Sequence, residues 1–206
     1  MNKRKMIPIA TPKMGEEEWQ ALREPIETGW LTQGPKVAAF ENEFARYHKV
    51  KHALATTSCT TALHLALLAV GVEPGDAVIV PSFTWVATAN AVEYCGATPV
   101  FCDIDPYTYN IDPASARTKI EESIRKGLKV KAIIPVHLFG LYADMEAILA
   151  LAGEYNLKVV EDAACASGAL YRGKTAGPLG NVGCFSFHPR KVLVTGEGGM
   201  CTTNDD

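Results

Sequence analysis

The sequence predicts an α/β protein with a mostly parallel central sheet and helices on both faces of that sheet. One observation and one general rule of topology carry this prediction. Short apolar runs alternate with amphipathic stretches along most of the chain, from Lys36 to Asp162. Consecutive strands separated by helices are joined by right-handed crossovers, which place helices on both faces of a largely parallel sheet.

The predicted elements follow one another along the chain. The first helix is expected to begin at Pro35, because proline is favoured in the first turn of a helix. Val37, Phe40, Phe44 and Tyr47 then lie on one stripe, at the spacing of an amphipathic helix. We expect helices over 35–48, 60–70, 86–94, 113–126 and 144–155, and strands over 52–57, 77–80, 98–103, 130–136 and 158–162. After the last of these strands the pattern changes to short β-like pieces and glycine-rich turns.

Composition and charge exclude several classes of protein. The chain has 206 residues, of which 48% are apolar and 21% charged, which excludes disordered, collagen-like and coiled-coil proteins. This length favours one domain, or one and a fraction, with a sizeable core. The formal net charge of −3 indicates no nucleic acid and no anionic membrane as partner. No apolar run is long enough to span a bilayer.

The cytoplasm is the expected location. The apolar run Met6–Ala10 is too short for a signal peptide and is interrupted by Pro8. The six cysteines contain no Cys-x-x-Cys pair, and a chain of this size needs no disulfides. We therefore expect free thiols in a reducing compartment, and no metal site.

The chemistry is expected at one edge of the sheet. In open α/β sheets, ligands bind beyond the carboxyl ends of the strands. Site residues are therefore expected in the segments that follow predicted strands, which are 57–60, 81–85, 137–140 and 162–165.

One stretch matches the phosphate-loop pattern of nucleotide triphosphate-binding proteins, in which the loop follows a buried strand and opens a helix. Gly168 begins this match, which ends in Gly173-Lys174-Thr175. The next residues, Ala-Gly-Pro-Leu-Gly, cannot begin a helix, and the residues between the two glycines are β-like. A hairpin turn at Arg172-Gly173-Lys174 is the preferred interpretation, and nucleotide triphosphate binding is kept as an alternative.

Three other features carry candidate chemistry, each with a simpler alternative. The backbone N–H groups and hydroxyls of 57–61 converge at a helix N-terminus, which stabilises a phosphate, although an N-cap by Ser58 or Thr60 is the commoner explanation. Asp162 ends a buried strand, where a carboxylate needs a cation or a strong donor unless it only caps a following helix. Lys191 lies near apolar residues and a glycine-rich backbone, so it is either a nucleophilic amine or a solvated surface lysine.

These features occur in one order along the chain. A phosphate site at a helix start is followed by an aromatic residue after a strand, an aspartate that ends another strand, and a Ser-Phe-x-x-x-Lys segment. The supporting stretches are 29–35 (GWLTQGP), 57–67 (TSCTTALHLAL), 81–90 (PSFTWVATAN), 135–140 (PVHLFG), 161–164 (EDAA), 186–191 (SFHPRK) and 195–199 (TGEGG). This order resembles that of fold-type I pyridoxal phosphate enzymes. It is most similar, over the whole chain, to the sugar aminotransferases of the DegT/DnrJ/EryC1/StrS family.

The resemblance implies roles for three residues around a bound pyridoxal 5'-phosphate (PLP). Lys191 is the catalytic residue, whose amine bonds to the cofactor and then transfers the proton. Asp162 pairs with the pyridine nitrogen and keeps it protonated, so that the ring acts as an electron sink. Trp85 stacks on the face of the ring.

The same resemblance implies which residues contact the cofactor phosphate and the ring hydroxyl. The backbone at Cys59 and Thr60, with the hydroxyls of Thr60 and Ser186, holds the phosphate. The family usually has glycine where Cys59 stands. It usually has histidine or glutamine near the ring hydroxyl where Cys165 stands, and a thiol is a poorer donor there.

The activity implied by the resemblance is transamination. Relatives with histidine in place of Lys191 are dehydratases, so the lysine favours transfer of an amino group. Glutamate is the implied donor and a nucleotide-linked keto-deoxy sugar the implied acceptor, in a homodimer whose subunits share their active sites. A phosphate-loop nucleotide-binding protein and a catalytically silent regulatory relative remain the alternatives.

The resemblance also implies a domain organisation. Residues 36–206 are expected to form the PLP-binding large domain, after an N-terminal segment and helix over residues 1–35. The family continues into a smaller C-terminal domain that we expect this chain to lack, so the large domain is expected to be incomplete at its C-terminal end. Such a fragment is expected to self-associate through exposed apolar surface, to hold the cofactor weakly and to turn over little sugar.

Overall fold

The computed structural model describes residues 6–177 and 179–206, and its centre is a seven-stranded sheet. Its strands are β1 (His52–Thr56), β2 (Asp76–Pro81), β3 (Thr98–Cys102), β4 (Lys129–Ile133), β5 (Lys158–Asp162), β8 (Val182–Ser186) and β9 (Gly199–Thr203). Across the sheet their order is β1-β9-β8-β5-β4-β2-β3. All pairings from β8 to β3 are parallel, whereas β9 runs antiparallel to both β8 and β1.

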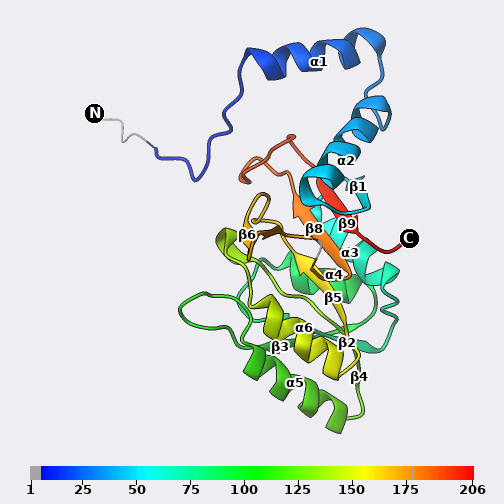
Figure 1. Cartoon of the computed structure of the whole chain (residues 1–206), viewed down its shortest axis with the longest axis vertical. Helices are drawn as coiled ribbons and strands as arrows, with labels where there is room; N and C mark the ends of the chain where they lie inside the picture. Colours follow the sequence, from blue (N-terminus) through cyan, green and yellow to red (C-terminus); the bar gives the residue numbers. More distant parts are fainter. Residues whose placement is uncertain (1–5, 178) are drawn as a thin grey trace.

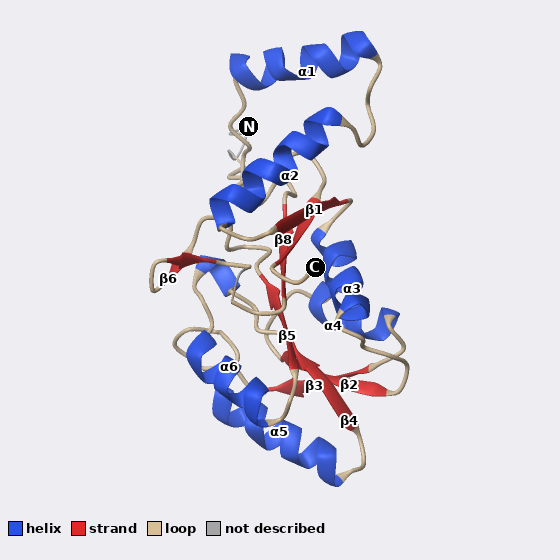
Figure 2. Cartoon of the chain, turned by 45° about the vertical axis from the view of Figure 1, so that its right-hand side comes forward, coloured by secondary structure: helices blue, strands red, loops and turns tan. Residues whose placement is uncertain are grey.

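Helices cover both faces of this sheet, which confirms the predicted fold class. One face carries α3 (Cys59–Ala69) and α4 (Ala87–Tyr94), and the other carries α2 (Pro35–His48), α5 (Pro113–Arg125) and α6 (Met145–Glu154) (Figure 1). Figure 2 shows α5 and α6 together on one side of the strands and α3 on the other. The helix bounds agree with the predicted ranges to within a residue at either end, and α2 begins at Pro35 as expected.

Alternation along the strands separates two hydrophobic cores. Residues on the α3 and α4 side include Val80, Ile134, Val160 and Cys184. Their strand neighbours Ile79, Ile133, Val159 and Phe185 belong to the core under α2, α5 and α6. The same alternation sends the last two residues of β5, Glu161 and Asp162, to opposite faces, because successive side chains in a strand point in opposite directions. Both carboxylates are buried.

The strands differ from the prediction at one place that matters for the site. The strand expected to reach residue 136 ends at Ile133, because the chain leaves the sheet there. Val136 then returns to make an isolated parallel bridge with Asp162, and the N–H of Asp162 donates to the carbonyl of Pro135. The segment that follows β4 is therefore tied to the end of β5.

A further helix, α1 (Glu16–Thr28), precedes the sheet and extends away from it (Figure 1). Three glutamates occupy its first turn, where their negative charges interact favourably with the positive end of the helix dipole. None of its residues is buried, and Trp19, Leu22 and Ile26 form an exposed apolar stripe. Among the described residues, no helix is both long and apolar enough to cross a bilayer.

The apparent phosphate loop is a β-hairpin, as preferred from the sequence. β6 (Leu170–Tyr171) pairs antiparallel with β7 (Lys174–Thr175). The two residues between them, Arg172 and Gly173, have φ values of 50° and 80°. Positive φ at both central positions is the signature of a tight two-residue hairpin turn. The N–H groups of this segment therefore do not form the start of a helix that could hold a nucleotide triphosphate.

Candidate active site

A cavity of about 300 Å³ lies at the carboxyl end of the parallel strands. Its walls come from the start of α3, the loop after β2, the ends of β5 and β8, and the loop that leads into β9. Seven residues singled out from the sequence all line it: Cys59, Thr60, Trp85, Asp162, Cys165, Ser186 and Lys191. The structure thus brings the predicted site residues together, as expected for ligand sites in open α/β sheets. The role of each residue remains a prediction.

The start of α3 forms one end of the cavity. Ser58 is the N-cap, and its Oγ accepts a hydrogen bond of 3.1 Å from the N–H of Thr61. The simpler interpretation of this segment, an N-cap at Ser58, is therefore confirmed. This cap leaves other N–H groups of the helix end free. The N–H groups of Cys59 and Thr60 lie in the first turn and have no carbonyl partner within the helix. These two groups, with the dipole of α3, favour an anion.

Gly199, the first residue of β9, lets the chain approach this helix end. A Cβ built at Gly199 would lie 2.5 Å from the carbonyl carbon of Ser58 and 2.7 Å from the nitrogen of Cys59. Any larger residue would therefore push β9 and the start of α3 apart. The position of the helix end relative to β8 and β9 depends on this glycine.

Cys59 stands at the first position of α3 with its side chain buried in the core. Burial raises the pKa of the Cys59 thiol well above its ordinary value. The thiol consequently stays neutral and adds no negative charge beside the anion-binding N–H groups. The helix end thus accommodates the small side chain where the resembled family usually has glycine.

Asp162 is buried at the opposite wall, at the end of β5. Its Oδ2 accepts a hydrogen bond of 2.8 Å from the hydroxyl of Thr88, and its Oδ1 accepts one of 3.1 Å from the N–H of Ala164. Burial raises the pKa of Asp162, although these two donors and the charge of Lys191 partly offset the shift. No helix follows in 163–169, so capping a helix is not its role. A cation beside this carboxylate would relieve its desolvation.

A chain of two threonine hydroxyls leads to Asp162, and sequence reasoning gave neither residue a role. Thr88 Oγ1 lies 2.9 Å from Thr84 Oγ1. Because the Thr88 hydroxyl uses its proton for Asp162, Thr84 must donate to Thr88. Thr84 lies in the loop before α4 and Thr88 is the second residue of that helix, so their contact depends on how the loop enters the helix. No local pattern of the sequence indicates this contact.

Lys191 reaches the cavity from the loop after β8. It is half-buried, and its Nζ donates a hydrogen bond of 3.2 Å to the Sγ of Cys165. It is therefore not a solvated surface lysine. Trp85 lies on the loop after β2 and is 74% exposed, so its ring is available to cover a ligand in the cavity.

Glu161 supports the site from the other face of the sheet, and sequence reasoning also missed this role. Its carboxylate accepts a hydrogen bond of 3.0 Å from His137 Nε2 and bonds from the N–H groups of Gly177, Leu179 and Gly180. His137 Nδ1 accepts from the N–H of Ala143, which places the ring proton on Nε2. This buried network fixes the loop beside β5, directly behind Asp162.

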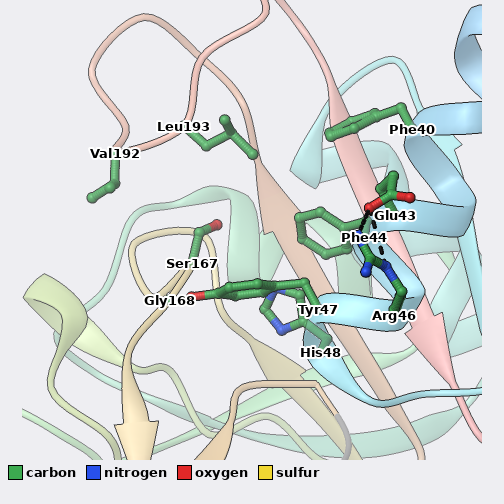
Figure 3. A pocket seen from close by; sticks show the side chains of 10 residues that line it. All are labelled: Phe40, Glu43, Phe44, Arg46, Tyr47, His48, Ser167, Gly168, Val192 and Leu193. Atoms are coloured by element: carbon green, nitrogen blue, oxygen red, sulfur yellow. Dashed lines mark hydrogen bonds and ion pairs between the residues drawn. The ribbon is translucent and has the colours of Figure 1, made fainter.

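A second, larger cavity of about 630 Å³ lies beside α2. In Figure 3, Phe40 and Phe44 of α2 lie on one side of it and Val192 and Leu193 on the other. Its lining is dominated by apolar and aromatic side chains, and its charged pair, Glu43 and Arg46, is engaged in an ion pair. The chemistry therefore belongs to the smaller cavity, where an amine, a buried carboxylate and a free helix end converge.

Comparison with known proteins agrees with this arrangement. Residues 12–206 match the DegT/DnrJ/EryC1/StrS aminotransferase family. The chain is 51% identical to a GDP-perosamine synthase from Caulobacter vibrioides over 201 residues, which cover 97% of this chain and 53% of that protein. The chain spans about half the length of the curated relatives it matches.

Solved structures give the same result. An aminotransferase of this family from Brucella abortus superposes with a TM-score of 0.88 at 41% identity, covering 90% of this chain and 50% of that one. A Streptococcus pneumoniae protein described as a sugar aminotransferase, in its PLP form, has a TM-score of 0.88 at 32% identity, covering 97% of this chain and 53% of that one. The predicted resemblance is confirmed, and the chain belongs to the DegT/DnrJ/EryC1/StrS aminotransferase family.

Proposed function

We propose that this chain forms the cofactor-binding part of a PLP-dependent aminotransferase, which transfers an amino group from glutamate to a nucleotide-linked keto-deoxy sugar. The observation that carries the proposal is the convergence of Lys191, Asp162 and the free end of α3 on one cavity. The name of the relative from Caulobacter vibrioides, a GDP-perosamine synthase, supports a nucleotide-linked sugar as the substrate class.

The residues present fit PLP on structural grounds. The buried carboxylate of Asp162 has a raised pKa and needs a cation, which a protonated pyridine nitrogen would provide. The N–H groups of Cys59 and Thr60 lie at a helix end to which β9 packs so closely that only glycine fits at position 199. Free N–H groups at a helix N-terminus bind phosphate. When bound, PLP supplies an electron sink for the carbanion that forms at the substrate carbon.

The side chains of this chain then have separate tasks. Lys191 binds the cofactor through its amine and, when released, accepts and returns the substrate proton at Nζ. Asp162 holds a proton at the pyridine nitrogen, and Thr88 keeps the Asp162 carboxylate oriented through its hydrogen bond. Trp85 covers the ring and excludes water from that face. Ser186, at the end of β8, adds a hydroxyl to the phosphate-binding end of the cavity.

The test is reconstitution of the protein with PLP, comparing Lys191→Ala with Lys174→Ala as a matched control. Lys174 lies in the hairpin strand β7, away from the cavity lining. We expect Lys191→Ala to abolish both transamination and the visible absorbance of the lysine-bound cofactor while the fold persists, and Lys174→Ala to keep both. Full activity in Lys191→Ala would overturn the proposed mechanism.

Two further parts of the proposal concern assembly. We propose that residues 36–206 form the PLP-binding large domain and that the protein acts as a cytoplasmic homodimer with shared active sites. The exposed stripe of Trp19, Leu22 and Ile26 on α1 supports a partner. Apolar side chains that a helix leaves exposed to water contribute no burial energy until another protein surface covers them. Sedimentation would test this, since a stable monomer with full activity would contradict it.

A further inference from the structure

We propose that Cys184 and Cys201 form a reversible disulfide when the protein meets a peroxide, and that this bridge closes directly beneath the phosphate-binding end of the cavity. Both cysteines are free thiols in the structure. The effect on the cofactor rests on the proposed function, whereas formation of the bridge does not.

The strand register places the two cysteines opposite each other. Cys184 of β8 is the direct partner of Cys201 in the antiparallel strand β9. The carbonyl of Cys184 accepts from the N–H of Ala163, on the β5 side of the strand, so the backbone groups of Cys184 point away from β9. Cys184 and Cys201 therefore form a non-hydrogen-bonded pair.

The geometry of such a pair suits a disulfide. In non-hydrogen-bonded antiparallel pairs the Cα atoms are about 4.5 Å apart and the side chains lie close on the same face. This separation falls at the short end of the range that disulfides span, about 4.4–6.8 Å. The separation lies within that range, so the bridge can form, and thiol–disulfide exchange with a reductant can open it again.

The two thiols differ in burial and acidity in a way that assigns their roles. Cys201 is partly exposed, whereas Cys184 is fully buried. A hydrogen bond from the Cys184 thiol lowers the pKa of Cys201, while burial raises the pKa of Cys184. Among the described residues no group of three His, Cys, Asp or Glu side chains lies close enough together to hold a metal ion.

The chemistry balances with hydrogen peroxide as the oxidant. The Cys201 thiolate attacks one peroxide oxygen, which breaks the O–O bond, releases hydroxide and leaves a sulfenic acid on Cys201. The Cys184 sulfur then attacks the Cys201 sulfur, the S–O bond breaks, and water leaves with the Cys184 proton. In total two thiols and one peroxide give one disulfide and two waters.

The bridge would act on the cavity through the next pair along the same strands. Ser186 and Gly199 are paired two residues beyond Cys184 and Cys201, on the same face of the sheet. Gly199 is the residue packed against Ser58 and Cys59 at the start of α3. Most disulfides span a longer Cα separation than this pair, so the bridge would move β8 and β9 apart at the cysteines and shift the Ser186 hydroxyl and the helix end relative to each other. We expect the dissociation constant for PLP to rise about tenfold, equivalent to about 1.4 kcal/mol.

The first measurement is peptide mapping, which needs no cofactor. The whole chain is treated with hydrogen peroxide, its free thiols are blocked with iodoacetamide, and it is digested with trypsin without reduction. Cleavage after Lys174, Arg190 and Lys191 separates the two cysteines into the peptide 175–190 and the peptide that begins at Val192. We expect these peptides to be linked, and dithiothreitol to release them.

Variants make the result specific. Cys201→Val should abolish the link, and Cys102→Ala, which removes a buried thiol far along the sheet in β3, should leave it intact. A link that involves Cys59 or Cys165 instead, or a link only between two chains, would overturn the proposal. Thermal denaturation of each variant verifies that it is folded.

The second measurement is PLP affinity before and after peroxide treatment, by cofactor absorbance. Affinity should fall in the unsubstituted chain and stay constant in Cys201→Val. A linked protein with unchanged affinity would overturn the coupling to the phosphate-binding end. If the reduced protein bound no PLP, the proposed function would fail, while the peptide map would still decide whether the bridge forms.

Discussion

Replacing Thr88 by valine isolates the hydroxyl that orients Asp162. Valine preserves the shape of threonine but removes the donor that lies 2.8 Å from Asp162 Oδ2, in a position where Thr88 is completely buried. A hydrogen bond to a charged group contributes about 1.5–3 kcal/mol to stability, and one between neutral groups about 0.5–1.5 kcal/mol. We therefore expect Thr88→Val to destabilise the protein by about 1.5–3 kcal/mol when Asp162 is ionised.

The same substitution should change how stability depends on pH. Burial raises the pKa of Asp162 above its ordinary value of 3.8, so between these two values the folded protein binds more protons than the unfolded chain. Its free energy of unfolding therefore falls as pH rises through that window. Losing the Thr88 donor raises the pKa of Asp162 further, because the ionised carboxylate loses a hydrogen bond. The destabilisation should accordingly be larger at neutral pH than in acid, by about 1 kcal/mol.

Urea denaturation without added cofactor, at a series of pH values from about 4 to about 8, measures this difference. Thr118→Val is the matched control, because the Thr118 hydroxyl donates to the carbonyl of Ala114 on the exposed side of α5. The control should change stability by no more than about 0.5 kcal/mol at every pH. A loss in Thr88→Val that is equal at all pH values would refute the argument that Thr88 stabilises the ionised form of Asp162.

Three further substitutions test other parts of the structure. Asp162→Asn should retain PLP but lose orders of magnitude in transamination rate, because a neutral amide cannot stabilise a protonated pyridine nitrogen; an unchanged rate would leave Asp162 a purely structural role. Lys174→Ala should show the same lack of ATP binding in calorimetry as the unsubstituted chain, because its segment is a hairpin; ATP affinity that disappears with this change would restore the phosphate-loop interpretation. Glu161→Ala leaves His137 and three backbone N–H groups without their acceptor, and should cost about 3–5 kcal/mol in thermal or urea denaturation. A cost below about 1 kcal/mol would show that Gly177, Leu179 and Gly180 are held by other contacts.

Sequence patterns predicted the elements well because their signals are local. The apolar stripe from Pro35 and the turn chemistry of Arg172-Gly173 each act within a few residues, and both α2 and the hairpin form where expected. Five of the seven cavity residues lie in segments expected at the ends of strands, which meet at one edge of a parallel sheet. Ser186 and Lys191 were assigned from the Ser-Phe-x-x-x-Lys segment and the family resemblance.

Contacts between residues far apart in the sequence could not be predicted from local patterns. Nothing local to Glu161 shows that its carboxylate accepts hydrogen bonds from the N–H groups of Gly177, Leu179 and Gly180, since those contacts depend on how the chain returns to β5. The antiparallel direction of β9, and hence the opposition of Cys184 and Cys201, also follows from the sheet order rather than from either strand alone. Side-chain networks across elements need the fold before they can be recognised.

The pairing of β1 with β9 has a consequence for biosynthesis. Within the described chain β1 borders only β9, and His52 pairs with Thr203. β1 can therefore join the sheet only after β9 has been synthesised. A protein emerges from the ribosome N-terminus first, and closing so long a loop is entropically costly, which places this pairing late in folding. The start of α3 follows β1 directly and is positioned against Gly199. Anion binding at that helix end would therefore follow the synthesis of β9, and the ligand could not act as a template for the earlier strands.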